Sequence, residues 1–176
     1  MLHPYSVARN QQTYTVITSG FIHKDFTHLL FNMMSYFFFA FALEVRIGHL
    51  QFGVLYFISL IVSDIPSIIK HKNNYGYYSL GASGAISAVV FAAIMYDPTE
   101  IFNIMFIPVD IWAFVYGILY LGYCTYASKH SHDAINHDAH LYGALTGIVL
   151  AIAFGHGVIG SFVEQVTGAI NSIFHH

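Results

Sequence analysis

Charge is what this sequence lacks most. Its 176 residues include six lysines and arginines and nine aspartates and glutamates, together 9% of the chain, whereas an average soluble domain carries roughly 25% charged residues. Hydrophobic residues make up 56%, and the mean hydropathy is +0.60. So few charges cannot cover the surface of a small water-soluble globule, and the same figures exclude intrinsic disorder. The sequence therefore predicts a protein whose solvent is lipid.

Basic residues and cysteine are also scarce. The formal net charge is −3 with histidine neutral, and a nucleic-acid partner is not expected because its phosphates are bound through Lys and Arg. The single cysteine, Cys124, excludes an internal disulfide framework.

Long apolar runs divide the chain. A helix needs about 20 mostly apolar residues to cross the hydrocarbon core, and each span must be helical because lipid-exposed backbone has to satisfy its own hydrogen bonds. We predict five spans, at 27–46, 50–70, 81–97, 104–127 and 139–156. The expected fold class is all-α, a polytopic membrane helical bundle.

The two ends of the chain differ from these spans. Residues 1–26 are apolar over too short a stretch to cross, and we expect them to lie at the membrane surface. The tail at 158–176 places apolar residues at three- and four-residue steps, which is typical of an amphipathic helix at the interface. The predicted organisation is thus a surface segment, a transmembrane core over 27–157 and an interfacial tail.

Polar residues within spans are informative because placing them in lipid is costly. Successive spans alternate in direction, so the first, third and fifth begin on the same side. His28 and Asn32 share one helical face near the start of the first span. Gly81 and Ser83 open the third span, and His140 opens the fifth. We therefore expect these side chains to lie at a similar depth.

The chemistry of this group fits acyl transfer. A serine hydroxyl becomes a useful nucleophile when a neighbouring base accepts its proton, and histidine titrates in the right range. His140 is the candidate base for Ser83. A helix that begins at the serine also directs free amides toward an oxyanion, and His28 and Asn32 are candidate side-chain donors.

Simpler structural interpretations exist for each signal. A Gly-x-Ser-Gly sequence in an apolar helix commonly serves helix packing, and Asn32 can hydrogen-bond across helices. A different class of function is metal binding or transport. Asp133, His137 and His140 follow one another at i, i+4 and i+7, a spacing that lines one helical face with zinc or iron ligands.

At these residues the sequence resembles the rhomboid family of intramembrane serine proteases. Three segments carry the resemblance, in the family's order and on the family's helices: residues 28–32, 81–84 and 139–147. Residues 44–48 also resemble the turn that follows the family's second span. The combination is specific although each piece is common.

The resemblance implies a Ser83–His140 dyad, with Ser83 as the nucleophile and His140 as the general base. It implies that His28, Asn32 and the Ser83 amide stabilise the oxyanion, with Gly81 shaping the same loop. The implied substrates are transmembrane segments of other membrane proteins, and the mechanism needs no cofactor and no metal ion. The implied location is an integral, multi-pass position in a membrane, the cell or inner membrane if the source is bacterial.

Two departures from the family pattern leave an alternative open. The family's basic core has six spans, and the predicted span 27–46 matches its second, so the chain is either a truncated form or a core that works without the first. Some members carry an aromatic residue one turn after the serine, stacked on the catalytic histidine, where this chain has Ser87. The alternative is a proteolytically inactive relative that binds membrane helices without cutting them.

Overall fold

Three long apolar helices form the frame of the molecule. The computed structural model describes residues 1–176 except 104–109, 132, 134 and 175–176. Within that part, three helices are long and apolar enough to cross a membrane: α3 (Phe26–Ile47), α4 (His49–His71) and α7 (His137–Phe154). Their ends fall within two residues of the predicted spans 27–46, 50–70 and 139–156, which are thereby confirmed as long apolar helices.

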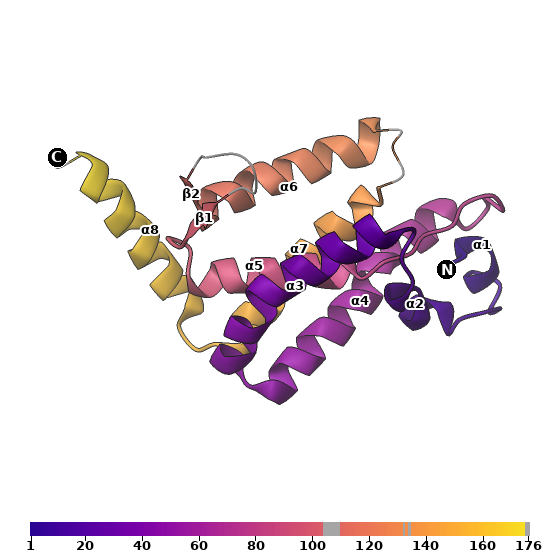
Figure 1. The fold of residues 1–176 in the computed structure, drawn as a ribbon, viewed down its shortest axis with the longest axis horizontal. Coiled ribbons are helices and arrows are strands. Elements are labelled where there is room, and N and C mark those ends of the chain that lie inside the picture. Colours follow the sequence, from indigo (N-terminus) through magenta and orange to yellow (C-terminus); the bar gives the residue numbers. More distant parts are fainter. Residues whose placement is uncertain (104–109, 132, 134, 175–176) are drawn as a thin grey trace.

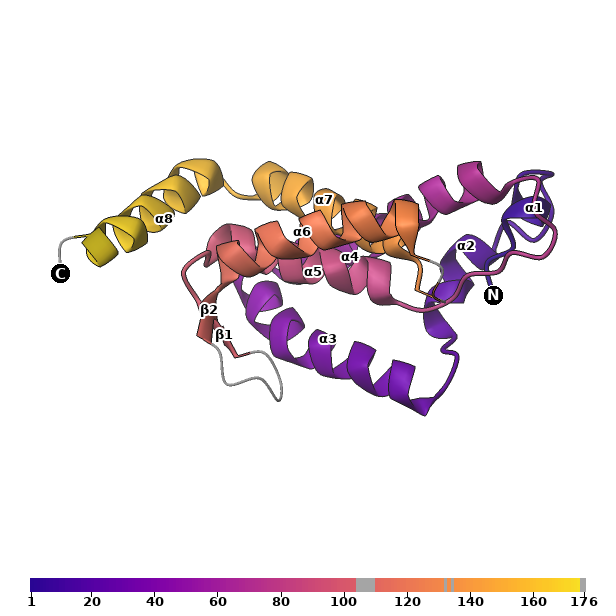
Figure 2. The ribbon, with the colours of Figure 1, turned by 90° about the horizontal axis from the view of Figure 1, so that it is seen from above.

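The helix α5 (Ser83–Tyr96) is shorter and lies inside the bundle. Its 14 residues rise only about 21 Å, less than the hydrocarbon thickness of about 30 Å. Ten of them are buried. Figure 2 shows α5 between α3 on one side and α7 on the other, and α5 contacts both. The predicted span 81–97 thus corresponds to a helix that is enclosed by protein.

Very close contact joins α5 to α7. A Cβ atom added at Gly143 would overlap the backbone carbonyl of Gly84, and one added at Gly147 would overlap that of Ala88. Small residues let helix backbones approach in this way, which favours helix association in membranes. The α5–α7 pair is therefore the tightest part of the core.

The predicted fourth span, 104–127, is wrong at its start. Two short antiparallel strands, β1 (Ile101–Asn103) and β2 (Asp110–Trp112), precede α6 (Ala113–His130). The amides of Ala113 and Phe114 donate to backbone oxygens of the loop after α5, at 2.8 and 2.9 Å, which ties this point of the chain to that loop. The fold is therefore mostly helical rather than all-α. Residues 104–109 lie outside the described residues.

The segment before α3 packs against the loop that leads into α5. It contains the short helices α1 (Pro4–Val7) and α2 (Thr15–Thr18) and the 3-10 turn η1 (Ser19–Phe21). Leu2 is fully buried and pairs with Ser79 through backbone hydrogen bonds of 2.8 and 3.0 Å. The Gly81 amide donates to the Ser19 carbonyl at 3.0 Å. These bonds hold the loop just before Ser83.

The last helix, α8 (Val158–Phe174), follows a turn at Gly157, whose φ is +77°. Figure 1 and Figure 2 show it projecting from the bundle at the end far from α1 and α2. Exposed apolar side chains, including Ile159 and Val163, lie along it, as the sequence predicts for a helix at the interface. The division of the chain at 26 and 157 stays a prediction.

Candidate active site

Ser83 and His140 face each other across the α5–α7 contact. Ser83 is the first residue of α5, and His140 lies in the first turn of α7. The Ser83 Oγ and the His140 Nε2 are 2.8 Å apart, which is the separation expected of a nucleophile and its base. Both side chains are half-buried. The structure thus brings together the two residues that the sequence selected.

The N-terminal cap of α7 holds the helix turn that carries His140, the candidate base. The side-chain oxygen of Asn136 accepts a hydrogen bond from the Ala139 amide at 3.0 Å, which satisfies one of the free donors at a helix start. The amide nitrogen of the same side chain, Nδ2, donates to Ser79 Oγ at 3.0 Å and to Ser67 Oγ at 2.9 Å. Asn136 therefore couples the start of α7 to α4 and to the loop that precedes Ser83.

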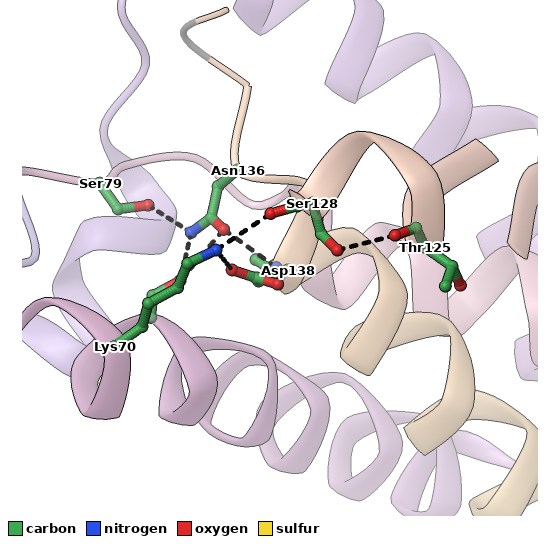
Figure 3. A network of polar contacts seen from close by, with 8 residues as sticks. Lys70, Ser79, Thr125, Ser128, Asn136 and Asp138 are labelled. Atoms are coloured by element: carbon green, nitrogen blue, oxygen red, sulfur yellow. Dashed lines mark hydrogen bonds and ion pairs between the residues drawn. The ribbon is translucent and has the colours of Figure 1, made fainter. Parts of the chain in front are cut away.

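A second polar contact closes the same end of the bundle, as Figure 3 shows. The Lys70 ammonium donates to Asp138 Oδ2 at 2.9 Å and to the Ser128 carbonyl at 3.0 Å. Lys70 lies in the last turn of α4, Asp138 in the first turn of α7, and Ser128 in the last turn of α6. The ion pair thus joins three helices close to the dyad.

Gly81 lets α3 approach the serine loop. Its φ of +109° lies in a region that side chains disfavour. A Cβ atom at this position would lie 2.8 Å from Cε1 and 2.9 Å from Nε2 of His28, and 3.7 Å from Nδ2 of Asn32. The structure therefore places His28 and Asn32 beside Gly81, two residues before Ser83.

The His28 ring presents Nε2 to this loop. Its Nδ1 accepts a hydrogen bond from the Lys24 amide at 3.4 Å, so in the neutral ring Nε2 carries the proton. Asp25 caps α3 by accepting from the His28 amide at 2.8 Å. The ring of His23 packs edge-on against the His28 ring, with 5.1 Å between the ring centroids. Burial, followed by the charge of His28, lowers the pKa of His23. His28 is thus a hydrogen-bond donor aimed at the loop.

Asn32 supplies a second donor. It is 7% exposed, and among the described residues its Nδ2 has no hydrogen-bond partner. Buried polar groups are normally paired. An amide donor that is buried beside a serine loop and has no partner is a group that an oxyanion can satisfy.

Tyr120 is a site neighbour that the sequence analysis missed. Its hydroxyl lies 3.0 Å from Ser87 Oγ, and its ring is within 21° of parallel to the His140 ring at a centroid distance of 6.5 Å. The aromatic group near the histidine comes from α6 rather than from position 87. Local spacing gave no signal for it, because 33 residues separate Tyr120 from Ser87.

The structure groups the residues of the alternative metal-ligand set differently from their spacing in the sequence. The Asp133 carboxylate oxygens each lie 3.1 Å from His137 Nε2, so Asp133 is a partner of His137. The hydrogen bond from Ser131 is the main reason that the pKa of Asp133 falls to about 2. The third group that faces His137 and His140 is Cys124.

Comparison with known proteins identifies the family. The rhomboid domain model matches residues 10–157. The rhomboid protein YdcA of Bacillus subtilis (strain 168) is 31% identical over 144 residues, 81% of this chain and 67% of that protein. RHOMBOID-like protein 12, mitochondrial, of Arabidopsis thaliana is 28% identical over 170 residues, 88% of this chain and 49% of that protein.

A mammalian rhomboid-like protein is also similar to most of this chain. Presenilin-associated rhomboid-like protein, mitochondrial, of Rattus norvegicus is 32% identical over 149 residues, 82% of this chain and 38% of that protein. The fold defines a polytopic, mostly helical integral membrane protein. The chain belongs to the rhomboid family, and it spans about half or less of the length of the two mitochondrial relatives.

Proposed function

We propose that the protein is an intramembrane serine endopeptidase that cuts transmembrane segments of other membrane proteins. The observation that carries the proposal is the 2.8 Å contact between Ser83 Oγ and His140 Nε2. Membership of the rhomboid family supports it, because the name of the relative YdcA contains the words rhomboid protease. The side-chain donors His28 Nε2 and Asn32 Nδ2, which lie beside the serine loop, support it independently of the family.

The first chemical step is attack by serine. His140 Nε2 accepts the Ser83 proton as Oγ forms a bond to the scissile carbonyl carbon, so the ring must carry its other proton on Nδ1. The 2.8 Å contact pre-orients this transfer. The products of the step are a tetrahedral oxyanion and an imidazolium ion.

Donors around the serine loop stabilise that oxyanion. They are the Ser83 amide, Asn32 Nδ2 and His28 Nε2. The first amides of a helix lack partners within it, and the positive end of the α5 dipole adds to their effect. Fixed donors of this kind need no reorganisation during the reaction, and each is worth about 2.7–4 kcal/mol of transition-state stabilisation.

Collapse of the intermediate completes the cut. The imidazolium of His140 gives its proton to the leaving amine, the carbon–nitrogen bond breaks, and the acyl group stays on Ser83. Water then attacks the ester with His140 again as the base, the bond between the acyl carbon and Ser83 Oγ breaks, and the imidazolium returns its proton to Oγ as the acid product leaves. Water reaches the dyad from the polar end of the bundle, since both side chains are only half-buried. No cofactor enters either half of the reaction.

Cleavage of a single-span substrate tests the proposal. The full chain and its Ser83→Ala variant are reconstituted in lipid bilayers with a labelled transmembrane protein that carries small, helix-breaking residues near one end of its span. We expect cleavage by the wild type and loss of at least about 1,000-fold in the variant.

Ser59→Ala is the matched control. Ser59 is a fully buried serine of α4 whose hydroxyl has no hydrogen-bond partner among the described residues, so its variant should cut at close to the wild-type rate. Cleavage that persists in Ser83→Ala would contradict the dyad. Stable binding of the substrate span by the wild type without any cleavage would instead support the inactive helix binder.

A further inference from the structure

A second cluster of side chains that can bind a ligand shares His140 with the dyad. The Cys124 sulfur, one ring nitrogen of His137 and one of His140 all lie within 4.8 Å of one another. Cys124 comes from α6 and both histidines come from α7. Cys124 and His137 are buried, at 0% and 4% exposure. Thiolate and imidazole groups at this spacing are a ligand set for a borderline or soft divalent metal.

His137 is prepared for such a role. Its Nε2 contacts both carboxylate oxygens of Asp133 at 3.1 Å, so Nε2 carries the proton and Nδ1 presents a lone pair. Nδ1 is buried, and among the described residues it has no hydrogen-bond partner. A carboxylate behind a histidine is the usual outer support of a metal-binding imidazole. The orphaned nitrogen is thus an independent sign of a missing ligand.

In His140 the same atom, Nδ1, is the ring nitrogen that Ser83 does not engage. Its Nε2 is engaged by Ser83 at 2.8 Å, which leaves Nδ1 for the group formed with Cys124 and His137. In a tetrahedral zinc site, ligand atoms stand roughly 3.3–3.6 Å apart, given Zn–N and Zn–S distances of about 2.0–2.3 Å. Side-chain movements on the order of 1 Å would close the three ligands around one ion.

We propose that Cys124, His137 and His140 form a zinc-type metal site whose occupancy switches the dyad off. The metal would bind through the Cys124 thiolate and Nδ1 of each histidine, with water as the fourth ligand. Binding releases the Cys124 thiol proton to solvent. Asp133, which is exposed at the loop before α7, gives the site a side that faces water.

The inhibitory effect follows from the histidine tautomer and rests on the proposed function. To act as a base, His140 needs its proton on Nδ1 and a lone pair on Nε2. A metal on Nδ1 moves that proton to Nε2, where the ring can only donate to Ser83. The hydroxyl then has no base to accept its proton. Metal binding and Ser83 activation therefore compete for one ring.

Cobalt spectroscopy tests the site without any assay of activity. Co²⁺ replaces Zn²⁺ in such sites, and a Co²⁺–thiolate bond gives a charge-transfer absorption. Cys124 is the single cysteine of the chain, so this band reports on one residue. We expect the folded, full-length protein to develop the band with one equivalent of Co²⁺ and to lose it when Zn²⁺ is added. Absence of the band would overturn the proposal.

Variants separate this site from surface histidines. His137→Ala should weaken Co²⁺ binding at least tenfold, and His137→Gln serves if the alanine variant fails to fold. His156→Ala removes an exposed histidine between α7 and α8 and should leave the titration unchanged. A full-strength band in a folded His137 variant would overturn the proposed ligand set.

The second arm measures inhibition. A fluorophosphonate probe labels activated serines, and each variant is compared with its own zinc-free sample. Zn²⁺ should suppress labelling of Ser83 in the wild type, and at least tenfold more Zn²⁺ should be needed in Cys124→Ala. Equal sensitivity of the two proteins would overturn the switch. A protein that binds cobalt but never labels would refute the protease instead, so the two failures are distinguishable.

Discussion

Two of the three helices that carry the candidate active site, α5 and α3, are held in opposite ways. The nucleophile opens α5, of which ten of 14 residues are buried. The side-chain donors His28 and Asn32 lie on α3, of which only three of 22 residues are buried. The protein therefore holds the nucleophile and its base by close backbone packing. It holds the oxyanion donors on a peripheral helix, so the two parts should respond differently to substitution.

The largest effect should come from the α5–α7 contact. In Gly143→Ala the new Cβ overlaps the Gly84 carbonyl, so the helices must separate and the dyad must lengthen. Overpacking of this kind costs about 1–3 kcal/mol, and we expect cleavage to fall to background. Unfolding in mixed micelles and the cleavage rate measure the two effects.

Gly122→Ala is the control for that substitution. No described atom outside its own helix lies within 4 Å of a Cβ built at Gly122 in α6, and alanine favours helix by up to about 1 kcal/mol over glycine. This variant should be as stable as the wild type or more so, and fully active. Equal losses of stability and of cleavage rate in the two variants would contradict a particular role for the α5–α7 contact.

Loss of a donor on α3 should reduce the rate without loss of fold. Asn32→Ala removes the buried Nδ2, and we expect kcat to fall about 100- to 1,000-fold with little change in KM, as for other oxyanion donors. Met33→Ala, at the neighbouring exposed position, is the matched control. A change confined to KM would assign Asn32 to substrate binding rather than to the oxyanion.

Two ion pairs at opposite ends of the bundle offer a smaller contrast. Lys70 pairs with Asp138 near Ser83, and Arg46 pairs with Asp97 at the far end of α5, at 2.9 and 3.0 Å. Both pairs are partly exposed, so each substitution to Met should cost no more than about 1 kcal/mol. Only Lys70→Met should slow cleavage, by severalfold. Equal rates in the two variants would remove the Lys70 contact from the positioning of the dyad.

The smallest effect should come from Tyr120. Tyr120→Phe keeps the ring beside His140 but loses the hydroxyl contact with Ser87, and one neutral hydrogen bond contributes about 0.5–1.5 kcal/mol. We expect a two- to tenfold loss of kcat, with Tyr116→Phe on the same helix as the control. A larger loss in Tyr120→Ala than in Tyr120→Phe would show that the ring also matters.

The frame of this fold could be predicted from sequence because lipid imposes length and composition on each span. The position of Ser83, His140, His28 and Asn32 near one end also followed from the alternating direction of the spans. Their roles remain predictions. The strands β1 and β2 were missed because apolar residues predominate in both, and hydropathy does not distinguish apolar strands from helix.

Contacts between distant parts of the chain were beyond the sequence pattern. Tyr120 reaches Ser87 because α6 packs against α5, and Cys124 reaches His137 and His140 because α6 packs against α7. The i, i+4, i+7 spacing correctly placed two histidines on one side but selected Asp133 as the third ligand. Helical periodicity describes one helix, whereas these sites are built from two.

The most direct test of the account is chemical labelling of the serine. The full chain in bilayers is treated with a fluorophosphonate, and the modified residue is located by mass spectrometry in the wild type, in His140→Ala and in the control His156→Ala. We predict one adduct, on Ser83, in the wild type and in His156→Ala, and at least a 100-fold slower reaction in His140→Ala. Labelling of Ser83 at an unchanged rate without His140, or an adduct on another serine, would contradict the dyad.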